Sequence, residues 1–434
     1  MDKFIRGKIS MIKDTILDMV YQYAEEKLNK TVFVPGISPV PVSGAVLYPE
    51  DIREVADTLL EFWYTDWKKC AEFKRRLCRV TGKKYCVLVN SGSSASLIAQ
   101  TALYNRHPGK YIITTALGFP TTVYPIWQNS RVPIFIDTDP ETLSPDWKQY
   151  NDEIGANKVR IPGSIFTHTL GFPFEEEQVA SDFFISDCCD ALGARSNGKN
   201  VGHAADAMTL SFFPAHQITS AEGGAILTDD VMLAAEMEQL INWGRDCFCP
   251  PGHSNMCGKR FEQDFPNLPK GWDHKYTFTK LGYNLKMTEF QAALGMSQLT
   301  HLDDFVEQRR RNYSRLQYLQ DEWFEWFSFI SIPDWSYPSP FGFPIMVRRT
   351  APFTAQELIS YLEKHKISTR RFFGGNLTRQ PFMKDLPRIR LDLTGTNYIM
   401  EQGFWIGCHP QLTKAHLDYV VEIFDKFFKE KGLK

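Results

Sequence analysis

His216 is the residue whose type and setting first suggest acid–base chemistry in this sequence. It lies in SFFPAHQITSAEGGAI (residues 211–226), in a turn between two apolar runs that are typical of strands. A histidine can accept and release a proton near neutral pH. We therefore treat His216 as a candidate for proton transfer.

A second candidate site lies in VNSGSSASLIAQTAL (residues 89–103), a pattern that predicts a strand, a Ser/Gly turn and a helix. The free backbone N–H groups at a helix N-terminus bind anions, so Gly92, Ser93 and Ser94 are suited to a phosphate group. An ordinary helix cap explains the same residues equally well.

Two further residues are suited to a flat ring that contains nitrogen. Asp187 follows the apolar run FFIS, and a carboxylate at the end of a strand can pair with a protonated ring nitrogen. Phe119, in LGFPTTV, can stack on such a ring. Taken singly, a turn-capping aspartate and a core phenylalanine are the commoner explanations, so these signals gain weight only together.

The nine cysteines are an odd number in a large chain, which argues against a disulfide framework. Four of them are suited to a metal centre, with 57, one and seven residues between successive members: Cys189, Cys247, Cys249 and Cys257. Four thiolates suit a 2Fe–2S cluster, a 4Fe–4S cluster or structural zinc, and buried free cysteines are a further alternative. The spacing alone does not identify the metal. Cys189 lies two residues after Asp187, however, and a position beside a ring that can take part in redox chemistry favours an iron–sulfur cluster.

The elements that must position these residues follow from the apolar pattern. Short apolar runs alternate with helical stretches, which predicts an α/β fold with a mostly parallel sheet covered on both faces. The runs expected as strands are 85–89, 111–116, 132–137, 164–169, 183–186, 208–213 and 224–229. Helices are expected at 9–28, from 52, and in one long stretch over 287–320. A smaller α/β segment follows, with strands at 343–347 and 404–407 and helices at 355–364 and 412–428.

This pattern predicts three parts along the chain. Residues 1–45 form an N-terminal helix and arm, residues 46–310 a large domain with the candidate site, and residues 311–434 a small C-terminal domain. The net charge of −2 over 434 residues gives no indication of a nucleic-acid or anionic-membrane partner. The N-terminus has charges every few residues and no run is long and apolar enough to span a bilayer, so we predict a cytoplasmic protein.

In their order along the chain, the phosphate site, Phe119, Asp187 and Ser211 resemble the sugar aminotransferase branch of the pyridoxal-phosphate enzymes. The resemblance implies the aspartate-aminotransferase type of fold (fold type I) and a homodimer. It implies that Gly92, Ser93 and Ser211 hold the cofactor phosphate, that Asp187 pairs with the ring nitrogen and that Phe119 stacks on the ring. GYNLKMTEFQAALG (282–295) is similar to the segment that lends an asparagine, here Asn284, to the neighbouring subunit's site.

Where this branch has a lysine that binds the cofactor covalently, the chain has His216, and no lysine lies between Lys199 and Lys259. We therefore expect pyridoxamine 5'-phosphate to be held non-covalently and its amine to condense with a ketone substrate. His216 would then take a proton from the cofactor methylene, and a hydroxyl group would leave, which is dehydration instead of amino transfer. An inactive paralogue with a structural histidine is the alternative.

PAHQIT, DCCDALG and the four-cysteine spacing more closely resemble the CDP-6-deoxy-L-threo-D-glycero-4-hexulose 3-dehydrase family of 3,6-dideoxyhexose biosynthesis. The resemblance implies pyridoxamine phosphate and one 2Fe–2S cluster on the four cysteines. It implies a nucleotide-linked 4-keto-6-deoxyhexose as substrate and an NADH-dependent iron–sulfur flavoprotein reductase as partner, in lipopolysaccharide O-antigen synthesis. Arg379 and either His274 or Lys275 are weaker candidates for substrate contacts.

The sequence departs from this family at two places. Gln217 stands where the family usually has histidine, and residues 63–73 (WYTDWKKCAEF) replace a glycine-containing loop. Three other functions stay open: a redox-independent 3-dehydratase of a GDP-sugar, a 3-dehydrase of a TDP-4-keto-2,6-dideoxyhexose, and a non-catalytic protein that binds nucleotide sugars. The four cysteines favour the iron–sulfur enzyme over the first of these.

Overall fold

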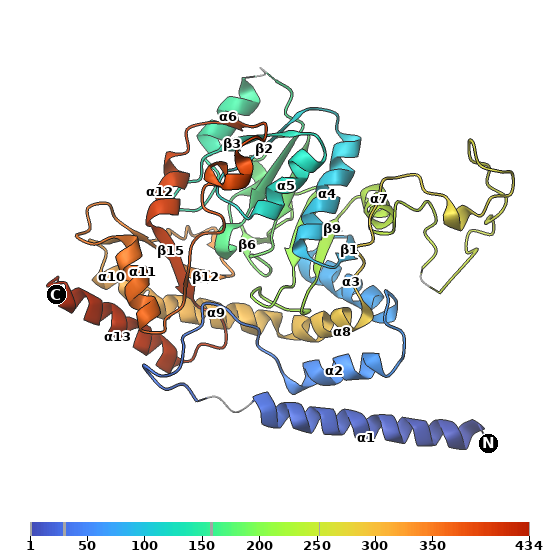
Figure 1. Ribbon diagram of the computed structural model, residues 1–434, viewed down its shortest axis with the longest axis horizontal. Coiled ribbons are helices and arrows are strands. Elements are labelled where there is room, and N and C mark those ends of the chain that lie inside the picture. The colour runs from blue at the N-terminus through green and yellow to red at the C-terminus, as the bar shows by residue number, and fades with distance from the viewer. Residues whose placement is uncertain (1, 29–31, 157–158, 251, 434) are drawn as a thin grey trace.

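The computed structural model describes residues 2–28, 32–156, 159–250 and 252–433, and a twisted eight-stranded sheet forms its centre (Figure 1). The strand order is β1-β9-β8-β5-β4-β2-β3-β14. In this order the strands are β1 (Tyr85–Val89), β9 (Gly224–Thr228), β8 (Ala207–Ser211), β5 (Phe183–Asp187), β4 (Gly163–Thr167), β2 (Tyr111–Thr115), β3 (Val132–Ile136) and β14 (Ile389–Arg390). Strand β9 runs antiparallel to both β1 and β8, and every other pair in this sheet is parallel, so the predicted mostly parallel sheet is confirmed.

Helices cover both faces of this sheet, as expected for strands that are buried throughout. Val87 of β1 packs in a core with α4 (Gly92–Arg106), α5 (Pro120–Gln128) and α7 (Val231–Ile241). The next residue, Leu88, faces the opposite core, which is built with α3 (Lys68–Thr81) and α8 (Glu289–Gln298). Farther along the same face, α6 (Trp147–Gly155) covers β2, β3 and β4.

A second, antiparallel sheet of four strands lies beside the first and has its own core. Its order is β10-β12-β15-β13, from β10 (Phe327–Ser328), β12 (Gly342–Val347), β15 (Gly403–Gly407) and β13 (Thr369–Arg370). Its helices are α11 (Ala355–Lys364), α12 (Thr394–Gln402) and α13 (Lys414–Glu430). This arrangement matches the predicted small α/β segment. A three-stranded ribbon adds β11 (Ser336–Tyr337), β6 (Arg195–Ser196) and β7 (Lys199–Asn200).

The helical stretch expected over 287–320 is confirmed, but it is not one continuous helix. The chain instead forms α8, a 3-10 turn at Leu299–His301, α9 (Leu302–Leu316) and the short α10 (Tyr318–Glu322). The break lets α8 pack against α2 (Pro49–Leu59) and α3, while α9 packs against α13 and β12. The apolar spacing alone cannot predict such a break, because α8 and α9 each have a buried apolar face and the spacing continues from one to the other. Residue 310, the expected boundary between the two domains, lies inside α9.

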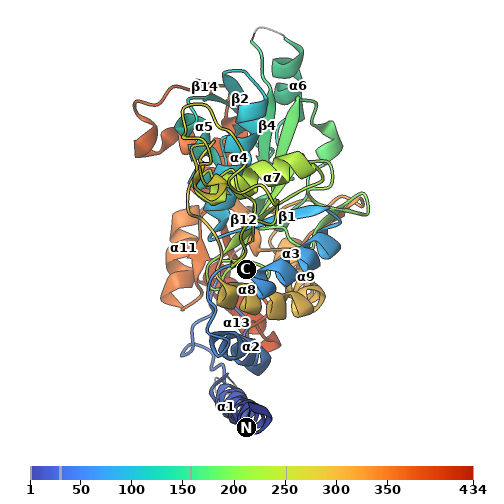
Figure 2. The same cartoon turned by 90° about the vertical axis from the view of Figure 1, so that its right-hand side faces the viewer.

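Two parts of the chain extend from this body. Helix α1 (Asp2–Leu28) lies alongside α2, away from both sheets, in Figures 1 and 2. The connection between α7 and α8, which carries Cys247, Cys249 and Cys257, projects outward beyond α7 in Figure 1; we call it the cysteine loop. Over the described ranges, no helix combines the length and the apolar character of a bilayer-spanning segment.

Candidate functional site

A cavity of about 600 Å³ opens where the carboxyl ends of the parallel strands meet the small sheet. Ligands of open α/β sheets bind at this edge. Most of the predicted site residues line it: Gly92, Ser93, Phe119, Asp187, Cys189, Ser211 and His216. The cavity therefore brings together residues that lie more than 120 positions apart in the sequence.

The phosphate-binding candidates lie at the first turn of α4. The Ser91 hydroxyl accepts a hydrogen bond from the Ser94 N–H (3.1 Å), which caps the helix so that it begins at Gly92. A Cβ atom added to Gly92 would lie 2.6 Å from Cβ of Ser211 and 3.3 Å from Sγ of Cys189. Only glycine therefore allows this helix end to approach β8, and the Ser211 hydroxyl meets the N-terminal end of the helix there.

Asp187 is buried at the floor of the cavity, and four donors orient its carboxylate. Oδ2 accepts from Oγ1 of Thr122 (2.7 Å) and of Thr167 (3.3 Å). Oδ1 accepts from Oγ1 of Thr209 (3.2 Å) and from the N–H of Cys189 (3.2 Å). These donors come from α5, from β4 and β8, and from the turn after β5, so the carboxylate is held on several sides where a ring nitrogen would lie.

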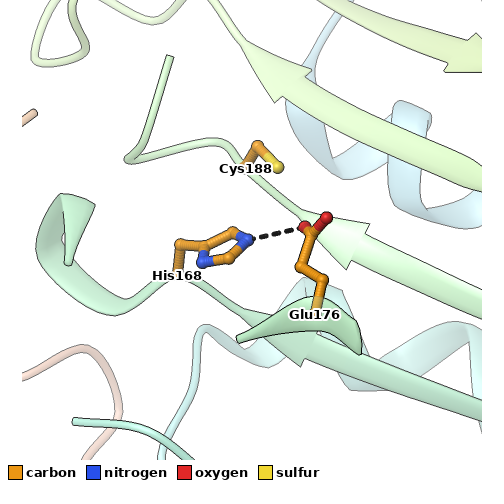
Figure 3. Close-up of side chains that lie close together, drawn as sticks. All are labelled: His168, Glu176 and Cys188. Carbon is orange, nitrogen blue, oxygen red and sulfur yellow. Dashed lines mark hydrogen bonds and ion pairs between the residues drawn. The ribbon is translucent and has the colours of Figure 1, made fainter. Parts of the chain in front are cut away.

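A buried hydrogen-bond network lies next to Asp187, around Glu176 (Figure 3). Oε1 of Glu176 accepts from the Ser186 hydroxyl (2.6 Å) and the Gly202 N–H (2.6 Å) and lies 2.9 Å from Nε2 of His168. Nδ1 of His203 lies 3.1 Å from Oε2. Burial alone would raise the pKa of Glu176, but hydrogen bonds from His168 and His203 outweigh it and hold this pKa well below its usual range. With Cys188 nearby, His168 and Glu176 form a set of residue types that can bind a metal. The Glu176 carboxylate is already hydrogen-bonded by the partners named above, so we interpret the network as stabilising the position of β5.

His216 points into the cavity from the turn after β8. Its Nδ1 atom lies 3.4 Å from Oδ1 of Asp190, and its ring lies 5.2 Å from the ring of Phe341. Phe119 lies at the start of α5, and half of its side chain is exposed in the cavity (51%). A flat ring placed between Asp187 and the cavity opening would have an aromatic surface and an imidazole within the same pocket.

The departure at Gln217 has a structural explanation. The side chain is buried and points away from the cavity, and its Nε2 atom donates to the main-chain oxygens of Asp190 (2.5 Å) and Ser339 (3.1 Å). Gln217 therefore ties the turn after β5 to the segment that leads into the small sheet. The departure at residues 63–73 leads into α3 and forms its first turns, where the buried Glu289 carboxylate accepts from the N–H groups of Trp67, Lys69 and Cys70.

The structure does not bring the four candidate metal ligands together. Cys189 lines the cavity, whereas Cys247, Cys249 and Cys257 belong to the cysteine loop and lie outside its lining. Across the described ranges, no three of these thiols come within ligating distance of one another. Burial, followed by the nearby Asp187 carboxylate, raises the pKa of the Cys189 thiol well above its usual range. A single chain in this conformation therefore does not present a four-thiolate site.

The remaining candidates also lie outside the cavity of their own chain. Asn284 is exposed, and its Oδ1 atom accepts from Nζ of Lys286 (2.6 Å). Arg379 pairs with Glu401 on the surface (3.0 Å). His274 is buried against Asp246, and Lys275 donates within the cysteine loop, to the oxygen of His253 and to Ser254.

Sequence reasoning missed several residues of the cavity. Asp190 lies in the same DCCD stretch as Asp187. A second carboxylate in that stretch was the signal that could have identified it as a site residue. Arg370 of β13, the next residue Arg371, and Trp405 of β15 line the cavity from the small sheet. Nothing in the sequence marks them, because the docking of the small sheet on the large one places them there.

Comparisons with known proteins agree with this geometry. The chain is 41% identical to the lipopolysaccharide biosynthesis protein RfbH of Salmonella typhimurium, over 96% of this chain and 98% of that protein. It is 40% identical to the dTDP-4-dehydro-2,6-dideoxy-D-glucose 3-dehydratase of Saccharopolyspora spinosa, over 96% and 92%. The E. coli GDP-4-keto-6-deoxy-D-mannose-3-dehydratase with bound hydrated PLP superposes with a TM-score of 0.79 at 23% identity, over 88% of this chain and 98% of that one.

These likenesses confirm the predicted fold, which is fold type I of the pyridoxal-phosphate-dependent transferases. Residues 47–425 match one family along almost the whole length of the body. From this match and the identity to full-length relatives, the chain belongs to the DegT/DnrJ/EryC1/StrS aminotransferase family.

Proposed function

We propose that this protein dehydrates a nucleotide-linked 4-keto-6-deoxyhexose at carbon 3 with pyridoxamine phosphate as cofactor, and that CDP-4-keto-6-deoxy-D-glucose is the substrate. The observation that carries the proposal is that His216 faces the cavity and that no lysine is found among its described lining residues. The 40% identity to a sugar-nucleotide 3-dehydratase supports the same reaction. A histidine transfers protons but cannot form the covalent link on which amino transfer depends.

The residues of the cavity fit the cofactor. The N–H groups at the start of α4, at Gly92 and Ser93, together with the Ser211 hydroxyl, would hold the phosphate. Asp187 would pair with the ring nitrogen, and Phe119 would lie against the ring. When bound, pyridoxamine phosphate supplies the amine that condenses with the ketone and a ring that withdraws electrons from the reacting carbon.

His216 would then remove a proton from the carbon next to that amine. The base is suited to this role because it is held at the edge of the cavity, where its ring lies between Asp190 and Phe341. At the side of the small sheet, Arg370 and Arg371 line the cavity and would meet the diphosphate of the nucleotide. The large domain would thus bind the cofactor, and the small domain would bind the nucleotide.

The proposal includes a 2Fe–2S cluster on Cys189, Cys247, Cys249 and Cys257, reduced by an NADH-dependent iron–sulfur flavoprotein reductase. It is supported by the placement of Cys189 in the cavity and by the number and type of the ligands. Because the single chain does not bring the four thiols together, cluster binding requires the cysteine loop to close onto Cys189, or a second copy to bring its loop there.

We further propose a homodimer, in the cytoplasm. Helix α1 supports it, because a stripe of its apolar side chains is exposed in the single chain: Ile5, Ile9, Ile12, Ile16, Met19 and Tyr23. Leu281, near Asn284, is 96% exposed. An exposed apolar stripe of this kind is typical of a surface that is covered in the assembled protein, and Asn284 would reach the neighbouring subunit's cofactor phosphate.

The test is to purify the protein without oxygen and to measure its iron and sulfide content and its visible spectrum. About two irons per chain and an absorption that dithionite bleaches are expected. The protein is then loaded with pyridoxamine phosphate and incubated with CDP-4-keto-6-deoxy-D-glucose, NADH and a reductase. Loss of the 3-hydroxyl is the expected outcome; substrate that is bound but never converted would mean a non-catalytic binding protein.

The separation of the four thiols favours a second candidate, a redox-independent 3-dehydratase that regenerates its cofactor with glutamate. Such an enzyme releases ammonia and needs neither iron nor a reductase. The same purified protein distinguishes the two candidates. Turnover by metal-free protein that depends on glutamate supports the second candidate, and turnover that requires iron and the reductase supports the first. GDP- and TDP-linked 4-keto sugars are assayed in parallel to identify the nucleotide.

A further inference from the structure

Asp190 is a buried carboxylate that faces the proposed base. It is 4% exposed, in the turn after β5, and its Oδ1 atom lies 3.4 Å from Nδ1 of His216. Both Oδ2 of Asp190 and Nδ1 of His216 are buried, and neither forms a hydrogen bond within the described part of the chain. Buried polar atoms without partners are costly, so a small closing movement that joins the two groups is favoured.

Arg309 fixes the backbone on which His216 lies. Its guanidinium is buried (1% exposed) and donates from Nη2 to the main-chain oxygens of Ala215 (3.3 Å) and His216 (3.1 Å). From Nη1 it donates to the oxygens of Pro340 and Phe341, both at 3.2 Å. One side chain of α9 therefore clamps the turn of the base to the segment that leads into the small sheet.

Further contacts limit the movement of this pair. The main-chain oxygen of Asp190 accepts from Gln217, the neighbour of His216 in the sequence. The ring of Phe341 lies against His216 at a centroid distance of 5.2 Å. These contacts hold the Asp190 carboxylate and the His216 imidazole next to each other.

We propose that Asp190 is a positioning residue for His216: it accepts a hydrogen bond from Nδ1–H, so that Nε2 presents its lone pair to the reacting carbon, with Arg309 holding the turn. This inference rests on the proposed function. When Nε2 took the proton from that carbon, the imidazole would become a cation, and the Asp190 carboxylate would stabilise that charge without itself being protonated. The electron pair of the broken C–H bond would move into the bonds that join the two reactants as the C–O bond at carbon 3 breaks, and the departing hydroxide and the proton on His216 together make up the water that is lost.

The first experiment does not depend on turnover. The protein is labelled with ¹⁵N-histidine, and the ring nitrogens of His216 are assigned by comparison with His216→Gln. The expected result is a proton on Nδ1 and none on Nε2 in the neutral ring, and a loss of this preference in Asp190→Asn. A neutral ring that carries its proton on Nε2 in the unchanged protein would overturn the inference.

The second experiment measures single-turnover dehydration with pyridoxamine phosphate and the nucleotide sugar. Asp190→Asn is expected to lower the rate constant at least about 100-fold with little change in the substrate concentration for half-saturation. Asp190→Glu, which keeps the charge, is expected to recover part of the rate. Asp182→Asn, a change in an exposed ion pair with Arg160, is the matched control.

The outcomes separate the inference from the proposed function. An unchanged protein that converts none of the nucleotide sugars would disprove the proposed function, while the histidine spectra would still decide the position of the proton. An active protein in which Asp190→Asn keeps the full rate would disprove the inference alone. Far-ultraviolet circular dichroism and melting temperatures confirm that the variants are folded, and Asp190→Glu keeps the test valid if the asparagine variant is not.

Discussion

Thr122, in the first turn of α5, donates a hydrogen bond from Oγ1 to Oδ2 of Asp187, at the end of β5, over 2.7 Å. We expect Thr122→Val to weaken the binding of pyridoxamine phosphate about tenfold. The change leaves one oxygen of a buried carboxylate without its shortest donor, and hydrogen bonds to charged groups contribute about 1.5–3 kcal/mol. Titration of the cofactor, followed by its absorbance, measures the effect.

The matched control for this prediction is Thr58→Val in α2. Thr58 is as buried as Thr122, but its hydroxyl donates only to the main-chain oxygen of Glu54, far from the cavity. Equal cofactor affinity of the Thr122 variant and the unchanged protein would show that the Asp187 carboxylate is not the group that holds the ring.

Gly92→Ala is expected to abolish tight binding of the cofactor phosphate. The new Cβ atom would lie 2.6 Å from Cβ of Ser211, so α4 and β8 would have to separate and the N–H groups would lose their alignment. We expect at least a tenfold rise in the dissociation constant of pyridoxamine phosphate and a smaller change for pyridoxamine, which lacks the phosphate. Gly155→Ala, at a glycine where no atom of the described residues lies within 4 Å of the added Cβ, serves as the control. An equal loss for both ligands would argue against a phosphate site here.

Glu176→Gln is expected to destabilise the folded protein by about 3 kcal/mol near neutral pH, because it removes a buried charge from a network of several donors. The native pKa of Glu176 is depressed, so the carboxylate stabilises the fold above its unfolded pKa of about 4.3, and this contribution is lost as the pH falls toward the native value. The difference between the unchanged protein and the variant should therefore shrink below about pH 4.

Urea unfolding at a series of pH values measures this difference. Glu177→Gln, at a partly exposed carboxylate of the same turn, is the control and should change stability far less. A difference that stays constant with pH would contradict the assignment of the effect to the Glu176 charge.

The exposed stripe of α1 gives a prediction about assembly. Replacing both Ile12 and Ile16 with aspartate puts two charges into the stripe, and we expect this variant to elute as a monomer of about 50 kDa and the unchanged protein to elute as the proposed dimer. Asp14→Lys, on the opposite side of the helix, should leave the dimer intact. Mass determination by light scattering distinguishes these outcomes, and a double variant that stays dimeric would show that α1 does not carry the interface.

Much of the fold could be predicted because its signals are local. Each apolar run that was expected as a strand of the large sheet is one, and the helices at both ends of the chain lie where apolar spacing placed them. The break at Leu299–His301 was missed, since the apolar repeat continues through it. Repeats indicate which residues are buried, and they do not indicate where a helix is interrupted by a 3-10 turn.

The sequence by itself determined the chemistry that is available: a helix start suited to a phosphate, a strand-end carboxylate, and a histidine where no lysine is near. These residues lie at or shortly after the ends of predicted strands, and the carboxyl ends of parallel strands always meet at one edge. Only the tertiary structure decided that Asp190 faces His216, that Arg309 joins their turn to the small sheet, and that three of the four cysteines lie away from the cavity. Contacts of this kind depend on the order of the strands and on how the two sheets dock, and neither is encoded in a local stretch of sequence.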